Sequence, residues 1–225
     1  MILNTDMSKK LIQTWFTAVV FLLLSLNAYA QKPFHLQNGD LIFIEECDGG
    51  MNSAIKAATS GLDGYNFTHV GIVWQKKNGQ TSIIEATPPK VRITPVQTYL
   101  HPKNQQCVPR AVVGRLKAQY QPLIPAAITS ARQKVGKPYD NAFNIHNDQY
   151  YCSELIYQIF KEANHGKEVF PLRAMTFKSK ETGEFPVYWV EHFKKMGIPI
   201  PEGEQGNNPG DMSRSDLINI VHFYQ

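Results

Sequence analysis

The segment Tyr151–Ala163 (YCSELIYQIFKEA) constrains the fold of this chain more than any other stretch. Its large apolar residues fall on one stripe of an α-helix, at positions i, i+1, i+4, i+5 and i+8: Leu155, Ile156, Ile159, Phe160 and Ala163. We therefore predict an amphipathic helix that buries this stripe against the rest of the fold.

Most other apolar runs in the chain are short and β-branched, which is typical of strands. We predict strands at residues 41–44, 68–74, 82–86, 91–94, 107–116 and 217–223. A second amphipathic helix is predicted at 124–135, with shorter helical pieces at 95–100 and 187–197. Residues 46–66 are predicted to be a loop that contains one helical turn or more.

The first thirty residues have the pattern of a secretory signal peptide. Lys9 and Lys10 precede an apolar run of about a dozen residues, which is too short to span a hydrocarbon core of about 30 Å. The run ends in Ala28-Tyr29-Ala30, a small-x-small cleavage pattern. We predict a signal peptide at 1–30, one domain at 31–225 and a periplasmic or secreted product with no stable membrane span. The alternative is an uncleaved N-terminal anchor.

The charge balance excludes one class of partner. The chain has 23 Lys and Arg and 19 Asp and Glu, and its basic residues are scattered rather than clustered. A nucleic-acid-binding protein would show a dense basic stripe. We therefore expect no nucleic-acid partner; the oligomeric state stays open.

The chain has three cysteines, an odd number for an exported protein. Oxidising compartments favour pairing, so at least one thiol is left over or bridges another chain. Cys47 and Cys107 either pair and leave Cys152 free, or all three are separate, partly buried thiols.

Cys152 lies in the first turn of the predicted helix at 151–163. Free backbone N–H groups and the positive end of the helix dipole favour a thiolate there, and they can hold the oxyanion that forms when a thiolate attacks a carbonyl. The alternative is a small buried cysteine on the inner face of the helix.

A thiolate nucleophile needs a base, and His69 is the best placed of the seven histidines. It opens an apolar strand, and Gly71 lies on the same face, where it leaves room for another backbone or a substrate. The competing interpretation is a half-buried structural histidine at a strand end.

Glu85 is the candidate to orient the ring of His69, and this depends on the hairpin register. A two-residue turn at Asn78-Gly79 would pair Val73 with Ile84 and turn Glu85 away from His69. A three-residue loop with Gly79 as a bulge would place Glu85 opposite Gly71, diagonal to His69. An isolated carboxylate in the apolar run IIEA is costly without a partner, so we predict the second register.

Five motifs together resemble a known family: GDLIF, THVGIV, IIEATP, GKPYD and YYCSELIYQIF. They are similar to the YiiX/YebB-like group of papain-fold hydrolases, a circularly permuted branch of the NlpC-type cell-wall peptidase superfamily. In that branch the histidine strand precedes the cysteine helix, as it does here. The resemblance runs from Gly39 to about Ala163, and the late segment PEGEQGNNPGD also looks family-like.

The resemblance implies an α+β fold in which a small antiparallel sheet packs against helices and the nucleophile lies at a helix N-terminus. It implies Cys152 as nucleophile, His69 as general base and acid, and Glu85 as the residue that orients the imidazole. Tyr151, where non-permuted relatives typically carry Asp, is a candidate substrate-binding residue. No metal or organic cofactor is expected.

The implied activity is cleavage of an amide bond, in a peptide or cell-wall substrate, through an acyl-enzyme. One alternative is a lipid-directed esterase or acyltransferase, and another is an inactive module that binds cell-wall peptides. A zinc site at Cys152 and His69 is remote, because no CxxC or HxxxH spacing supplies further ligands.

The segment from Pro171 to Pro209 is expected to wall the site. Its aromatic residues either line an apolar cleft or build the core; they are Phe177, Phe185, Tyr188, Trp189 and Phe193.

Overall fold

The computed structural model describes residues 34–62, 64–103 and 107–224. The predicted signal peptide at 1–30 lies outside the described residues. Residues 36–225 form one compact unit. In the described part of the chain, no helix combines the length and the hydrophobicity needed to cross a membrane.

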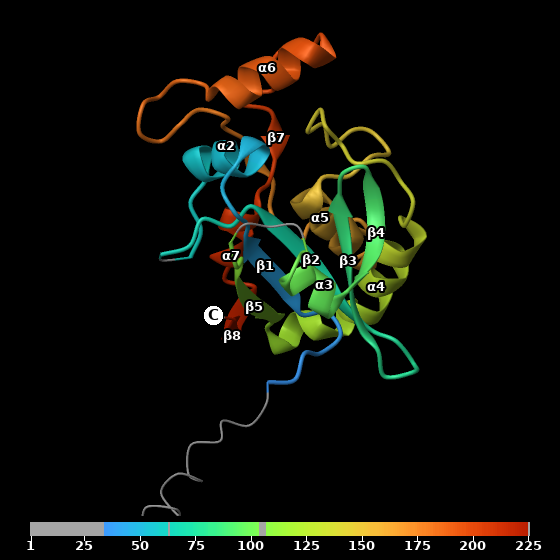
Figure 1. The fold of residues 1–225 in the computed structure, drawn as a ribbon. Coiled ribbons are helices and arrows are strands. Elements are labelled where there is room, and N and C mark those ends of the chain that lie inside the picture. Colours follow the sequence, from blue (N-terminus) through green and yellow to red (C-terminus); the bar gives the residue numbers. More distant parts are fainter. Residues whose placement is uncertain (1–33, 63, 104–106, 225) are drawn as a thin grey trace, which may run out of the picture. The chain divides into compact units, whose positions relative to one another are not determined.

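The centre of this unit is a six-stranded sheet in the order β4-β3-β2-β1-β5-β8 (Figure 1). Every neighbouring pair is antiparallel. The strands are β1 (Leu41–Glu45), β2 (His69–Gln75), β3 (Thr81–Thr87), β4 (Lys90–Pro95), β5 (Arg110–Leu116) and β8 (Ile218–Tyr224). All six predicted strands are present.

Helices cover both faces of the sheet. In Figure 1, α4 (Ile124–Gln133) and α5 (Cys152–Ala163) lie behind it, and the short α3 (Val96–Leu100) lies in front. Two further helices, α2 (Gly50–Ala58) and α6 (Val187–Met196), lie side by side at the top of the view. The remaining elements are the 3₁₀ helix η2 (Ala118–Leu123), α7 (Pro209–Ser213) and a small sheet of β6 (Arg173–Ala174) and β7 (Gln205–Gly206).

The apolar stripe of α5 is buried as its spacing predicts. Leu155, Ile156, Ile159 and Phe160 are all 0% exposed, and they share one core with Val70, Ile72 and Ile84 of the sheet. Complete burial of one such side chain contributes roughly 1.5–3 kcal/mol. Packing against the sheet therefore holds α5, and with it Cys152, in place.

The helical part expected within 46–66 is the nine-residue helix α2, which buries Ala54 and Ala58. One segment differs from the sequence prediction: the strand predicted from Cys107 begins at Arg110. The preceding Pro109 has no N–H for a ladder, and Cys107 is bonded to Cys47, with 5.8 Å between their Cα atoms. Of the two cysteine arrangements left open, the structure has the paired one, and Cys152 is free.

The β2–β3 hairpin has the register predicted from Glu85. Lys76 and Gln80 close a three-residue loop, and Gly79 has the positive φ (83°) of a bulge. The ladder ends with Ile72 opposite Ile84, so Gly71 is in register with Glu85 just beyond it.

The surroundings of Gly71 show how tightly side chains pack on the sheet next to Glu85. A Cβ at this position would lie 2.4 Å from Ile83 Cγ2 and 3.1 Å from the Tyr99 hydroxyl. The space that was predicted for a backbone or substrate is therefore filled by these two side chains. We expect Gly71→Ala to lower the free energy of unfolding by about 1–3 kcal/mol, measured by urea denaturation.

A double-mutant cycle with Ile83→Ala checks the cause. Truncating Ile83 removes the closest clash, so the loss in the double variant should be smaller than the sum of the two single losses. Additive losses would show that the contact with Ile83 is not what excludes a side chain at position 71.

Candidate active site

Cys152 is the first residue of α5, directly after the extended residue Tyr151. Its side chain is buried, and Sγ lies 4.0 Å from the backbone carbonyl oxygen of Thr68, which precedes β2. The packing of α5 against β2 thus brings the helix N-terminus to the start of the histidine strand.

His69 and Glu85 meet in a short hydrogen bond. His69 Nε2 lies 2.7 Å from Glu85 Oε2, and both residues are more than nine-tenths buried. The side chain of Cys152 also interacts with that of His69, and this interaction contributes to the raised pKa of the ring. The structure therefore brings the three predicted residues together in the order Cys152–His69–Glu85.

Glu85 is held as a carboxylate by groups from the two neighbouring strands, β2 and β4. Its Oε1 accepts hydrogen bonds from Thr94 Oγ1 and from Arg92 Nε, the latter at 3.1 Å. Burial alone would raise the pKa of Glu85, but His69, Thr94 and Arg92 outweigh burial and lower the pKa to about 2. Glu85 is therefore negatively charged at any physiological pH.

The charge of Glu85 affects the pKa of His69. Burial acts to lower the pKa of His69, yet the hydrogen bonds and charges of Cys152 and Glu85 raise it well above 6.5. The ring is therefore held as an imidazolium between two acidic groups. This arrangement is suited to stabilising a thiolate and to giving a proton to a leaving group.

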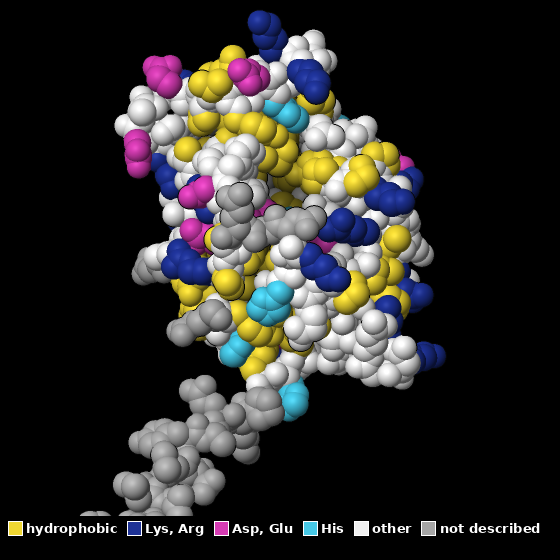
Figure 2. All heavy atoms as spheres, in the orientation of Figure 1, with side chains coloured by type: hydrophobic (Ala, Val, Ile, Leu, Met, Phe, Trp, Pro, Cys, Tyr) yellow, Lys and Arg dark blue, Asp and Glu magenta, His cyan; other side chains and the backbone are white. Residues whose placement is uncertain are grey.

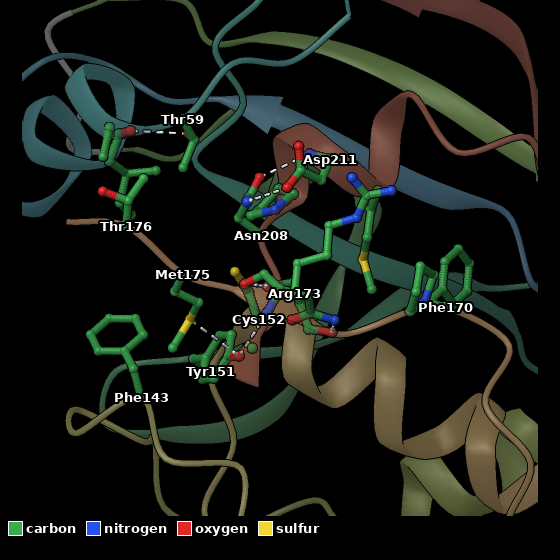
Figure 3. Close-up of a pocket in the computed structure, with 18 of the residues that line it drawn as sticks. Thr59, Phe143, Tyr151, Cys152, Phe170, Arg173, Met175, Thr176, Asn208 and Asp211 are labelled. Carbon is green, nitrogen blue, oxygen red and sulfur yellow. Dashed lines mark hydrogen bonds between the residues drawn. The ribbon is translucent and has the colours of Figure 1, made fainter. Parts of the chain in front are cut away.

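A cavity of about 720 Å³ opens beside Cys152. One part of its wall is apolar and includes Tyr139, Phe143, Phe177 and Trp189, while charged residues such as Arg173 and Asp211 line another part. Figure 3 shows residues from separate segments around it, with Cys152, Tyr151 and Met175 close together in the view. In Figure 2, hydrophobic side chains gather around a hollow near the region of α2 and α6. The site therefore offers a partly open space next to the thiol, with an apolar part and a charged part to its wall.

Tyr151 lines this cavity, as its proposed role in substrate binding requires. The side chain is 2% exposed, and its hydroxyl accepts a hydrogen bond from the backbone N–H of Asn207 at 3.2 Å. It also lies 3.9 Å from Met175 Sδ. Tyr151 thus connects the nucleophile helix to the late segment that walls the cavity.

The aromatic residues of the late segment divide between the two predicted roles. Phe177 and Trp189 line the cavity, whereas Phe193 is buried in the core behind it. Phe185 and Tyr188 are half-buried against the same core. The expectation that the segment from Pro171 to Pro209 walls the site agrees with the lining residues Pro171, Met175 and Asn207.

Tyr139 is a candidate site residue that the sequence analysis did not single out. It is buried in the cavity wall, and burial together with the charge of Cys152 raises the pKa of its phenol well above 10. Its hydroxyl lies 3.9 Å from Met51 Sδ. Tyr139 belongs to the motif GKPYD, but nothing in the spacing of that motif places its side chain beside Cys152.

Asp140 of the same motif explains how that loop is shaped. It is fully buried and accepts the backbone N–H groups of Ala142 at 2.8 Å and Asn144 at 2.6 Å. These bonds hold Phe143 in a left-handed conformation (φ 55°) with its ring edge-on to Trp189 at 5.5 Å. Asp140 therefore positions part of the apolar cavity wall.

Glu154, in the first turn of α5, caps the N-terminus of the helix with its side chain. Its Oε2 accepts the backbone N–H of Tyr151 at 3.1 Å, and the side chain is 3% exposed. Burial, with the charge of Asp140, raises the pKa of Glu154 to about 9. Glu154 is therefore a neutral acid at pH 7, which keeps negative charge away from the neighbouring thiol.

Comparisons with known proteins agree with this geometry. Residues 35–222 match the model of a family described as permuted papain-like amidase enzymes, the YaeF/YiiX or C92 family. An Escherichia coli K12 protein described as the uncharacterized protein YiiX is 30% identical over 146 residues, which is 64% of this chain and 66% of that protein, just under two thirds of its length.

A solved structure is also similar. It is described as the crystal structure of the metalloprotein YiiX from E. coli O157:H7, and it aligns with a TM-score of 0.65 and 23% identity. The alignment covers 84% of this chain and 98% of that chain. At this identity the match supports the fold alone, and it is the α+β fold with a permuted papain-like order that the sequence predicted.

Replacing Glu85 tests the origin of the imidazolium. In Glu85→Gln the ring loses a charge that favours its protonated form, while burial continues to oppose that form. We expect the pKa of His69, followed by NMR titration of the ring, to fall markedly from its native value. Glu181→Gln, at an exposed position, should leave the titration unchanged. An unaltered His69 titration in Glu85→Gln would contradict the electrostatic role.

Replacing Glu154 tests its neutral state. Because the pKa of Glu154 is 4.5 when unperturbed and about 9 in the fold, the folded state binds its proton more tightly than the unfolded state. The native protein therefore loses stability as pH rises from 4.5 towards 9. Glu154→Gln has no such carboxyl group and lacks this loss. The difference between its free energy of unfolding and that of the native protein should therefore rise with pH, by at most about 1.4 kcal/mol per pH unit across that window.

Chemical denaturation at several pH values measures this gain. Glu191→Gln, on an exposed face of α6, serves as the control and should follow the native pH dependence. A constant difference between Glu154→Gln and the native protein would mean that Glu154 is ionised in the fold.

Proposed function

Because the chain belongs to the family of permuted papain-like amidases, we propose that it is an exported cysteine hydrolase that cleaves an amide bond through an acyl-enzyme. In this proposal Cys152 is the nucleophile, His69 the general base and acid, and Glu85 the residue that orients and charges the ring. The observation that carries the proposal is the buried hydrogen bond between His69 and Glu85, with Cys152 beside the start of the histidine strand and acting on the pKa of His69.

The first half of the reaction forms a thioester. The Cys152 thiolate adds to the substrate carbonyl carbon, and the carbonyl oxygen becomes an oxyanion. Backbone N–H groups at the start of α5 are suited to stabilise it, and the buried phenol of Tyr139 is a second donor in the cavity wall. His69 gives its proton to the amide nitrogen, the C–N bond breaks and the amine leaves.

The second half restores the enzyme. Neutral His69 takes a proton from a water molecule, whose oxygen adds to the thioester carbonyl. The C–S bond then breaks, the carboxylic acid leaves and Cys152 is again a thiolate beside the imidazolium. Glu85 stays ionised throughout, because three donors hold its carboxylate.

A metal-dependent route needs a donor set that the site does not present. The solved relative is described as a metalloprotein. Among the described residues of this chain, no group of three or more His, Cys, Asp and Glu side chains is arranged to hold a metal ion. His69 Nε2 is already bonded to Glu85. The residues present do not fit a resident metal, and we assign no step to one.

The apolar cavity wall favours a second candidate, a lipid-directed esterase or acyltransferase. Tyr139, Phe143, Phe177 and Trp189 could pack an acyl chain next to Cys152, and the thioester chemistry is the same. Incubation with cell-wall fragments and with phospholipids, followed by mass spectrometry of the products, separates the candidates. Only a peptide or amide substrate would give a new amine.

The exported location rests on two features. The pattern at residues 1–30 is that of a signal peptide. The Cys47–Cys107 disulfide is of the kind that persists in oxidising compartments. Detection of the processed protein in a periplasmic or culture fraction, beginning after Ala30, tests this part of the proposal.

Replacing Cys152 tests the nucleophile. We expect Cys152→Ala to abolish labelling by a thiol-reactive acyl probe and to lower hydrolysis at least about 10³-fold, because the thioester cannot form. His69→Ala should reduce hydrolysis similarly. His146→Ala, the exposed histidine nearest to Cys152 in sequence, is the matched control and should keep native activity. Full activity in Cys152→Ala would refute the mechanism.

A further inference from the structure

Asn207 holds the chain on both sides of the nucleophile. It follows β7 and is 7% exposed. Its backbone N–H donates to the Tyr151 hydroxyl at 3.2 Å, and its backbone oxygen accepts the Ser153 hydroxyl at 3.2 Å. Its Nδ2 donates to the backbone oxygen of Ser153, also at 3.2 Å. The Asn207 side chain therefore lies directly against the first turn of α5.

The remaining polar atom of this side chain, Oδ1, has no hydrogen-bond partner. Only three buried side-chain N or O atoms in the described residues lack one: Ser82 Oγ, Trp189 Nε1 and Asn207 Oδ1. Asn207 and Trp189 both line the cavity that contains Cys152. Unsatisfied polar atoms in this part of the chain are thus concentrated in the wall of the site.

The orientation of the Asn207 amide follows from its surroundings. Reversing the amide would point Oδ1 at the Ser153 carbonyl oxygen, and two acceptors would then face each other. Oδ1 is therefore the unsatisfied atom, and it is an acceptor only. A buried acceptor without a donor is costly, so a partner with an N–H or O–H group is expected in the working state.

We propose that Asn207 Oδ1 accepts the N–H of the scissile amide and so makes the site selective for amides over esters. This inference rests on the proposed function, since it assumes that Cys152 attacks a carbonyl in this cavity. An amide offers an N–H next to the reacting carbon, whereas the corresponding ester oxygen has no hydrogen. Asn207 is thus a specificity residue, separate from the Cys152–His69–Glu85 line.

The hydrogen bond also serves the bond-breaking step. When the thiolate has added, the amide nitrogen gains a lone pair that must receive the proton of His69 before the C–N bond breaks. An N–H held by Asn207 fixes the rotation about the nitrogen and leaves that lone pair free. The amine leaves with the proton from His69, and the thioester remains on Cys152.

Matched substrates isolate this interaction. We would measure kcat/KM for the p-nitroanilide and the p-nitrophenyl ester of the same acyl group, using acetyl and octanoyl pairs. In Asn207→Leu, which keeps the volume but removes the acceptor, the anilide rate should fall about five- to tenfold more than the ester rate. Asn207→Ala is the second variant should the leucine side chain prevent folding, which thermal melting would reveal.

Asn207→Asp separates the proposed bond to the substrate N–H from the structural bond to the Ser153 carbonyl. It keeps an acceptor oxygen but loses the Nδ2 donor to Ser153, so both rates can fall while the anilide-to-ester ratio stays within about threefold of the native value. Asn219→Ala, at an exposed position of the edge strand β8 that does not line the cavity, is the control and should leave the ratio unchanged.

The outcomes are distinguishable. Equal losses for ester and anilide in Asn207→Leu and Asn207→Ala would show a purely structural brace and overturn the inference. A native enzyme that hydrolyses the esters but neither anilide would also overturn it, while leaving Cys152 as nucleophile. No acylation of Cys152 by any of the four substrates would count against the proposed function itself.

Discussion

The hydrogen bond between His69 and Glu85 is the interaction on which the rest of the site depends. A carboxylate buried to this degree is unfavourable alone, and its partners come from the two strands that flank β3: His69 on β2, and Arg92 and Thr94 on β4. The three-residue hairpin loop, the register of β2 with β3 and the charge on the imidazole all follow from satisfying this one group. This bond lowers the pKa of Glu85, and together with the interaction of Cys152 it raises the pKa of His69.

Most of the elements could be predicted because they depend on local pattern. Local pattern also made Cys152, His69 and Glu85 candidates, but the resemblance of the flanking motifs was needed to choose their roles over the structural alternatives. The stripe of α5 follows from helical spacing, and the cost of burying Glu85 distinguished between two registers. The wall of the cavity could not be predicted in this way. Asn207 meets Tyr151 and Ser153 across more than fifty positions of the sequence, and no periodicity encodes such a contact. The aromatic residues from 177 to 193 look alike in sequence, and only packing decides which of them face the cavity.

The site is assembled from parts of the chain with different tasks. The hairpin of β2 and β3 supplies His69 and Glu85, α5 supplies Cys152, and the late segment supplies much of the wall. The contacts of Tyr151 and Asn207 join the last two. Substitutions in the late segment can therefore change the shape of the cavity while Cys152, His69 and Glu85 keep their positions.

The Cys47–Cys107 disulfide also determines whether Cys152 can form a disulfide within the chain. The bridge closes a loop of 60 residues that contains the whole of β2, β3 and β4, whereas Cys152 lies outside it. Because a polypeptide is made from its N-terminus, both bridge cysteines emerge before Cys152 does. Once they are joined, Cys152 has no other cysteine of its own chain with which to form a disulfide. The order of synthesis and the bridge together thus protect this thiol from pairing within the chain.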